Sequence, residues 1–150
     1  MIRLVLVILA GSAALAVGVP AAERHPQHDL TVSSHGKTVQ ATRGSHCTAQ
    51  NGAMLCADSA YPLDTKRRLR VHGRGKLVLR FAEEPAEIDP SLRNRRSRSV
   101  HELVARGRGL KRTIRLPRRL PRGSDRLGVW VGYERGDADF EVDLRRHRHR

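Results

Sequence analysis

The chain has 150 residues, and its 29 Lys and Arg outnumber its 15 Asp and Glu, so the formal net charge is +14. The length leaves room for one domain and excludes a large multidomain enzyme. Leu, Ile, Val and Phe supply only about a fifth of the residues after position 21, close to the composition of disordered chains, so the pattern of apolar residues must decide for order.

The first 21 residues have the features of a secretory signal peptide. Arg3 precedes the uncharged stretch 4–22, which closes with Val19 and Ala21 at the −3 and −1 positions of a small-residue cleavage site. An uncleaved membrane anchor is the alternative, because 19 uncharged residues lie near the lower limit for spanning a bilayer. Cleavage would leave 129 residues with a net charge of +13 and would place the protein outside the cytoplasm.

A linker and a first hairpin follow. Residues 22–29 show no periodicity and are expected to link the signal to a domain of residues 30–144. Leu30 and Val32 alternate with polar neighbours up to a turn at residues 34–37, and residues 38–42 form the return strand.

Cys47 and Cys56 flank the strongest local signal, the dipeptide Asn51-Gly52. Asn-Gly favours a two-residue type I′ hairpin, because both turn positions need positive φ. Pairing outward from this turn brings the two cysteines together at a non-hydrogen-bonded pair, where Cα atoms lie about 4.5 Å apart. That separation suits a disulfide, and export supplies the oxidising compartment. A redox or zinc site is the alternative, but the spacing fits neither type of motif.

The segments Gly44–Cys47 and Cys56–Asp58 resemble the two-cysteine segment of uncharacterised exported proteins of Gram-positive bacteria, in which Gly-x-x-Cys precedes a short loop and Cys-x-Asp. Thr48 stands where many of those proteins have an aromatic residue. The resemblance covers residues 30–90, and it implies export, a disulfide and a small all-β domain without a known activity.

After an irregular crossing at residues 61–64, alternating apolar residues predict strands at 68–71 and 76–81 with a turn between them. Further strands are predicted at 113–116, 127–133 and 137–144. With eight or nine short strands and no long amphipathic helix, we expect an all-β fold, an antiparallel β-sandwich of the immunoglobulin-like kind with one disulfide-closed hairpin. Residues 145–150 are expected to form a disordered basic tail.

Basic residues on the outer faces of these strands are the main functional candidates. Without the tail the net charge of the exported chain is still +9. Guanidinium groups bind phosphates, sulfates and carboxylates, so we expect binding to teichoic acids, acidic polysaccharides or lipid headgroups. Few aromatic residues are available for stacking, so sequence-specific binding of nucleic acid is not expected.

The alternative is a structural or protein-interaction domain whose charge is incidental. The candidate residues are Arg68, Arg70, Arg80, Arg95, Arg96, Arg98, Arg115, Arg145 and Arg146.

Four carboxylates alternate along one predicted strand, at Asp137, Asp139, Glu141 and Asp143. Alternation places them on one face of the strand. They could hold Ca²⁺ or act as an acid–base pair, but we expect them to balance the charge of a neighbouring Arg-bearing strand.

Trp130 lies between Gly128 and Gly132, on the face opposite two valines. We expect the indole to cover these glycines on the outer face, and a ligand or partner contact is the alternative.

No catalytic group emerges from the remaining residues. Ser45 and His46 are neighbours on a strand and should point to opposite faces. The histidines lack the spacing of a metal site on a regular element. The sequence therefore predicts a protein that is not an enzyme and that holds no metal or cofactor.

Overall fold

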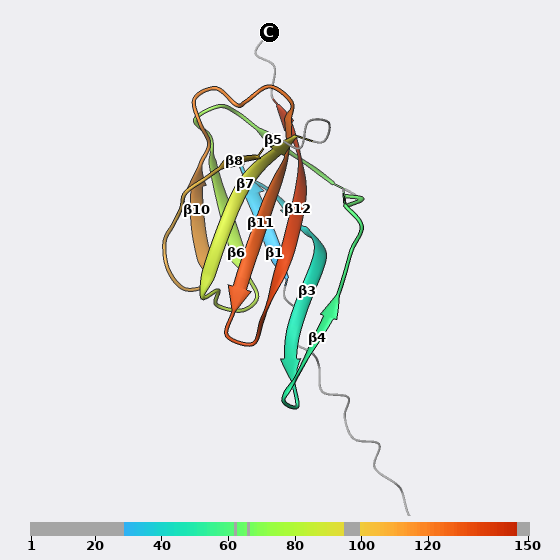
Figure 1. Ribbon diagram of the computed structural model, residues 1–150. Helices are drawn as coiled ribbons and strands as arrows, with labels where there is room; N and C mark the ends of the chain where they lie inside the picture. The colour runs from blue at the N-terminus through green and yellow to red at the C-terminus, as the bar shows by residue number, and fades with distance from the viewer. Residues whose placement is uncertain (1–28, 62, 66, 95–99, 147–150) are drawn as a thin grey trace, which may run out of the picture.

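The computed structural model describes residues 29–61, 63–65, 67–94 and 100–146. The predicted signal peptide, most of the linker and the three arginines Arg95, Arg96 and Arg98 lie outside these residues. The described residues contain twelve strands and no helix. The strands form two sheets that lie face to face as a sandwich (Figure 1).

The first layer is a five-stranded antiparallel sheet. Its strands lie in the order β2 (Lys37–Gln40), β1 (Leu30–Ser34), β6 (Lys76–Phe81), β10 (Lys111–Arg115) and β9 (Ala105–Arg106). β1 and β2 form the predicted first hairpin, in which Ser34 pairs with Lys37 across a turn at His35 and Gly36.

The second layer is a seven-stranded sheet built around two long strands, β11 (Ser124–Tyr133) and β12 (Gly136–Arg146). β7 (Glu87–Asn94) and then β8 (Val100–Glu102) extend the sheet beyond β11. The other edge of β12 pairs first with β3 (Thr42–Gln50) and then, in parallel, with β5 (Arg68–Val71). β4 (Ala53–Ala57) pairs with β3 and forms one edge of the sheet.

The core lies between the two sheets, and period-two alternation supplies it. Leu77 and Leu79 of β6 and Ile114 of β10 point inward from the first sheet and are fully buried. Val129 of β11 and Phe140 of β12 pack from the second sheet and are 1% exposed. A few large apolar residues suffice because nearly all of those in the central strands point to the same side.

The disulfide hairpin forms in the predicted register. Cys47 lies opposite Cys56, with a Cα–Cα distance of 4.1 Å, and the two are joined by a disulfide bond. Asn51 and Gly52 have φ values of 50° and 79°, as a type I′ turn requires. The bridge lies within one sheet, whereas the conserved bridge of immunoglobulin domains joins two sheets. The all-β sandwich is thus confirmed, and the immunoglobulin-like subclass stays a prediction.

Two features of β5 and β12 differ from expectation. The turn at residues 72–75 forms, with a hydrogen bond of 3.0 Å from Gly75 N to His72 O, but it carries the chain from one sheet to the other. Arg145 and Arg146 were expected in a disordered tail and instead continue β12, because β5 pairs with them.

The disulfide should stabilise the whole domain, because β3 also pairs with β12 in the centre of the sheet. Closing a loop of about ten residues reduces the entropy of the unfolded chain, so the variant with Cys47→Ala and Cys56→Ala should lose about 2.5 kcal/mol of unfolding free energy. Urea denaturation measures this loss. A decrease below about 0.5 kcal/mol would contradict the expectation and show that the hairpin opens independently of the sandwich.

Candidate anion-binding face

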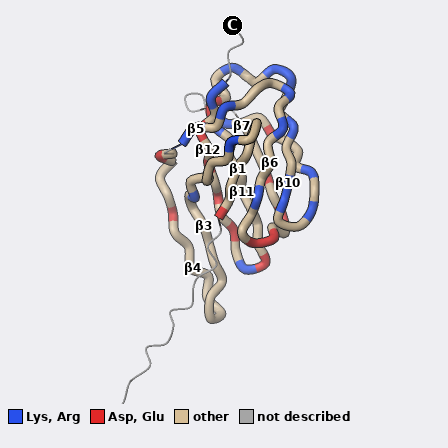
Figure 2. Tube along the Cα trace, turned by 180° about the vertical axis from the view of Figure 1, so that it is seen from behind, with Lys and Arg blue, Asp and Glu red and all other residues tan. Residues whose placement is uncertain are grey.

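The two sheets differ in their charge. Among the described strands, those of the seven-stranded sheet contain seven basic and eight acidic residues, which nearly cancel. Those of the five-stranded sheet contain no Asp or Glu, and Figure 2 shows Lys and Arg along β6 and β10. The excess positive charge of the strands therefore belongs to the five-stranded sheet. Its basic residues are Lys37, Lys76, Arg80, Arg106, Lys111, Arg112 and Arg115.

Four of these cations form two pairs of like charge on the outer face. In the register between β6 and β10, Arg80 lies opposite Lys111 and Lys76 lies opposite Arg115. All four are exposed, since the residues that alternate with them point into the core. Like charges directly opposite each other destabilise a sheet. An anion bound between the members of a pair would remove this cost.

Arg112 is the exception among the basic residues of β10. Its guanidinium donates to the carbonyl oxygens of Gly109 and, at 3.4 Å, of Pro85. This arginine braces two loops and is not part of the outer face.

A cleft continues the basic face toward β9. Lys76, Arg106 and Arg115 line it together with Thr113, which pairs with Arg106. The cleft has a volume of about 570 Å³, and residues 101–104 form part of the remaining wall. Glu102 is the one acidic residue of the lining, so three cations and a hydroxyl donor outweigh a single carboxylate, and the excess positive charge suits the oxygens of a phosphate or carboxylate group. We name the surface formed by Lys76, Arg80, Arg106, Lys111, Thr113 and Arg115 the basic face.

The predicted polyanion-binding residues fall into separate places. Arg80 and Arg115 lie on the basic face, where Lys76, Arg106 and Lys111 accompany them. Sequence reasoning missed Arg106 and Lys111 as site residues, because β9 has only two residues and Lys111 begins its strand. Only the pairing of β10 with β6 and with β9 shows that these two residues lie beside Arg80 and Arg115.

The remaining described candidates lie on the other sheet. Arg68 and Arg70 belong to β5, and Arg70 lies opposite Arg145 in the parallel ladder with β12. Arg68 Nε is 3.8 Å from a carboxylate oxygen of Asp143, so this guanidinium already has a partner. Arg146 donates to the carbonyl oxygen of Pro121.

Three of the four alternating carboxylates of β12, Asp139, Glu141 and Asp143, pair with arginines, as predicted. Arg126 on β11 is the central cation, and its side chain is only 3% exposed. It bonds to Glu141 through one terminal nitrogen, and its Nε lies 3.2 Å from Asp143 Oδ1. Arg93 on β7 approaches Glu141 at 3.5 Å and Asp139 at 4.0 Å. We name Arg126, Glu141 and Asp143 the buried ion cluster.

The buried ion cluster also binds the segment of chain that connects β4 to β5 and crosses the outer side of the sheet. Arg126 donates to the carbonyl oxygen of Leu63 at 2.8 Å, and the Leu63 amide donates to Glu141 at 3.1 Å. A Cβ atom on Gly44 of β3 would lie 2.6 Å from the hydroxyl of Tyr61, so this glycine makes room for the crossing. Burial, followed by the charge of Asp139, raises the pKa of Tyr61.

Trp130 points away from the core, as predicted. Its ring lies over Gly132, where a Cβ atom would come within 3.1 Å of the indole. Gly128 is covered by the guanidinium of Arg93, which would lie 2.4 Å from a Cβ atom there. The indole and the guanidinium thus each shield one glycine of the sheet surface.

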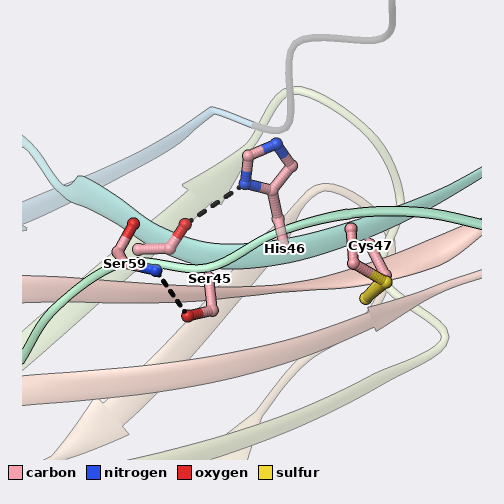
Figure 3. The surroundings of a disulfide bond; sticks show 6 residues. Ser45, His46, Cys47 and Ser59 are labelled. Atoms are coloured by element: carbon pink, nitrogen blue, oxygen red, sulfur yellow. Dashed lines mark hydrogen bonds between the residues drawn. A yellow bond between two sulfur atoms is a disulfide. The ribbon is translucent and has the colours of Figure 1, made fainter.

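The pair Ser45 and His46 forms no nucleophile–base contact. Figure 3 shows the two side chains pointing in opposite directions from β3. Ser45 Oγ accepts a hydrogen bond of 3.0 Å from the Ser59 amide, and His46 Nδ1 lies 3.2 Å from the Gly44 carbonyl oxygen. Within the residues that the structure describes, no three His, Cys, Asp or Glu side chains are grouped so that they could hold a metal ion.

Comparisons with family models, curated proteins and solved structures give no match for this chain. The resemblance to exported proteins of Gram-positive bacteria therefore stays a prediction. In the described part of the chain, no helix is long and apolar enough to cross a membrane.

Removing Arg126 should destabilise the fold strongly, because Glu141 and Asp143 would remain buried without their main cation. We expect Arg126→Met to cost about 3–5 kcal/mol of unfolding free energy, measured by chemical denaturation.

Arg68→Met is the matched control, since Arg68 pairs with the same Asp143 but its side chain is 66% exposed. An exposed pair contributes at most about 1 kcal/mol, so this variant should be nearly as stable as the wild type. Similar losses in both variants would contradict the central role of Arg126.

Proposed function

We propose that this chain is an exported, non-enzymatic module that binds anionic polymers through the basic face. The signal-like residues 1–21 and the Cys47–Cys56 disulfide support export, since disulfides persist in oxidising compartments. The observation that carries the binding proposal is the pairing of like charges, Arg80 with Lys111 and Lys76 with Arg115.

The spacing of the two pairs favours a polymer over a small ion. Lys76 and Arg80 are four residues apart on β6, which corresponds to about 13 Å along the strand. A single phosphate or carboxylate can bridge one pair only. A chain of anionic groups can occupy both pairs and continue past Arg106, and it gains affinity from the release of counterions.

The composition of the face favours envelope polymers over nucleic acid. The strands of the five-stranded sheet contain one aromatic residue, Phe81, and it is buried. The strands of this sheet therefore offer bases no exposed aromatic ring to stack on. Teichoic acids, acidic polysaccharides and arrays of lipid headgroups need only the charge and the donors that the face supplies.

A second candidate function is a structural or protein-interaction domain whose positive charge is incidental. The exposed apolar residues Met54 and Leu55 on β4 favour this candidate. Binding to a protein partner through these apolar residues would depend little on salt, whereas binding to a polyanion weakens steeply as salt is raised.

Removing one like-charge pair should weaken polymer binding more than removing the same charge from the other sheet. We expect Lys76→Ser with Arg115→Ser to reduce affinity for long-chain polyphosphate and to lower the slope of log affinity against log salt by about 1.5. Fluorescence anisotropy over a salt series measures both quantities.

Arg70→Ser with Arg145→Ser is the matched control, because it also removes two exposed arginines that lie opposite each other. Its slope should change by less than half as much. Equal changes in the two variants would mean that total charge decides binding, and no binding by the wild type at moderate salt would refute the proposal.

A further inference from the structure

The hairpin of β3 and β4 forms an arm that extends past the lower end of the sandwich (Figure 1). All five residues of β4 are exposed, and Met54 and Leu55 are 59% and 55% exposed. Large apolar side chains on both faces of an exposed edge strand are typical of an interaction site.

All of the arm beyond Arg43 also lacks charge. Residues 44–57 contain no Lys, Arg, Asp or Glu, and this is the longest such run after Ala22. Figure 2 shows the lower part of the arm, toward its turn, without basic or acidic residues, in contrast to the loops at the opposite end of the molecule. Two copies of a strongly basic protein repel each other, and the repulsion is weakest where this segment meets its counterpart.

The outer edge of β4 has backbone groups available for pairing. In a two-residue hairpin the residues that flank the turn form a hydrogen-bonded pair, and the type alternates outward. Ala53 and Leu55 therefore direct their backbone groups to β3, whereas Met54 and Cys56 direct theirs away from it. Natural edge strands are protected by Lys, Pro or a bulge, and β4 has none of these.

We propose that a second copy of this chain pairs with β4, strand to strand and antiparallel, around a two-fold axis at Leu55. In this register Met54 lies opposite the partner subunit's Cys56, and Cys56 lies opposite the partner subunit's Met54. Each of these pairs exchanges two backbone hydrogen bonds, so all the outward groups of both residues are used.

This register fixes the distance between Leu55 and the same residue of the second copy. Leu55 would lie opposite its own counterpart at a non-hydrogen-bonded pair, with Cα atoms about 4.5 Å apart. That is the same type of pair that holds the disulfide between Cys47 and Cys56 within the arm. An interface of two short strands is small, so the dimer should be weak and concentration-dependent.

Cross-linking tests the register. In the purified, disulfide-bonded protein, Leu55→Cys should form an intermolecular disulfide on mild oxidation, with the native bridge confirmed by peptide mass spectrometry. Ala53→Cys is the matched control, because it is exposed on the same strand but lies four residues, about 13 Å, from its counterpart in this register. Equal cross-linking of both variants, or of neither, would overturn the proposal.

Sedimentation of the unmodified protein tests the dimer itself. The wild type should show a mass that rises toward a dimer with concentration, and Leu55→Lys should remain a monomer with an unchanged melting temperature, because like charges would lie opposite each other. Gln40→Lys adds the same charge on the edge strand β2 of the other sheet and should still dimerise. A wild type that stays monomeric, or dimerisation that survives Leu55→Lys, would overturn the proposal.

Discussion

Arg126 lies on the side of the seven-stranded sheet that faces away from the core, but its side chain is buried there beneath the segment between β4 and β5. Much of the structure depends on the groups that pair with its charge. It bridges Glu141 and Asp143 on the neighbouring strand and donates to the backbone of Leu63. These contacts hold the segment between β4 and β5 against the sheet. β5 can then pair with the end of β12, and the chain can pass to β6 in the other layer. Burying a charge costs free energy unless it is paired. Arg126, Glu141 and Asp143 must therefore be buried as one group.

The same cluster explains why the two faces of the protein differ. Three of the four acidic residues of β12 pair with Arg126, Arg93 or Arg68. No acidic residue occurs in the described strands of the five-stranded sheet, so nothing within those strands neutralises its cations. The sheet therefore tolerates two like-charge pairs. The domain separates a sheet whose strands nearly balance their own charges from a sheet whose strands contain only basic charged residues.

Local patterns allowed the sequence to predict the parts of the fold that depend on neighbouring residues. Asn51 and Gly52 determine a turn, and the turn determines every pair in the disulfide hairpin. Alternation correctly assigned the outward carboxylates of β12 and the inward valines beside Trp130. The sheet to which a strand belongs is a long-range property, and the alternation at residues 68–71 fits either sheet equally well. The place of β5 could not be read from its sequence.

The same limitation applies to the candidate site. Arg80 and Arg115 were predicted because each alternates with apolar residues. Lys111 and Arg106 gain their role only when β10 pairs with β6 and β9. Arg126 stands just before the apolar alternation of β11 and resembles a solvent-exposed residue. Its partners lie 15 and 17 positions away along the chain, and only the pairing of β11 with β12 brings them together.

Under the proposed function, anionic polymers bind to the five-stranded sheet and not to positive charge in general. A titration of the isotope-labelled protein with polyphosphate, followed by amide chemical shifts in NMR spectra, tests it most directly. We expect the largest changes on β6, β9 and β10 and on the residues that line the cleft beside them. Changes concentrated on β5 and the end of β12, or spread evenly over all strands that carry arginine, would contradict it.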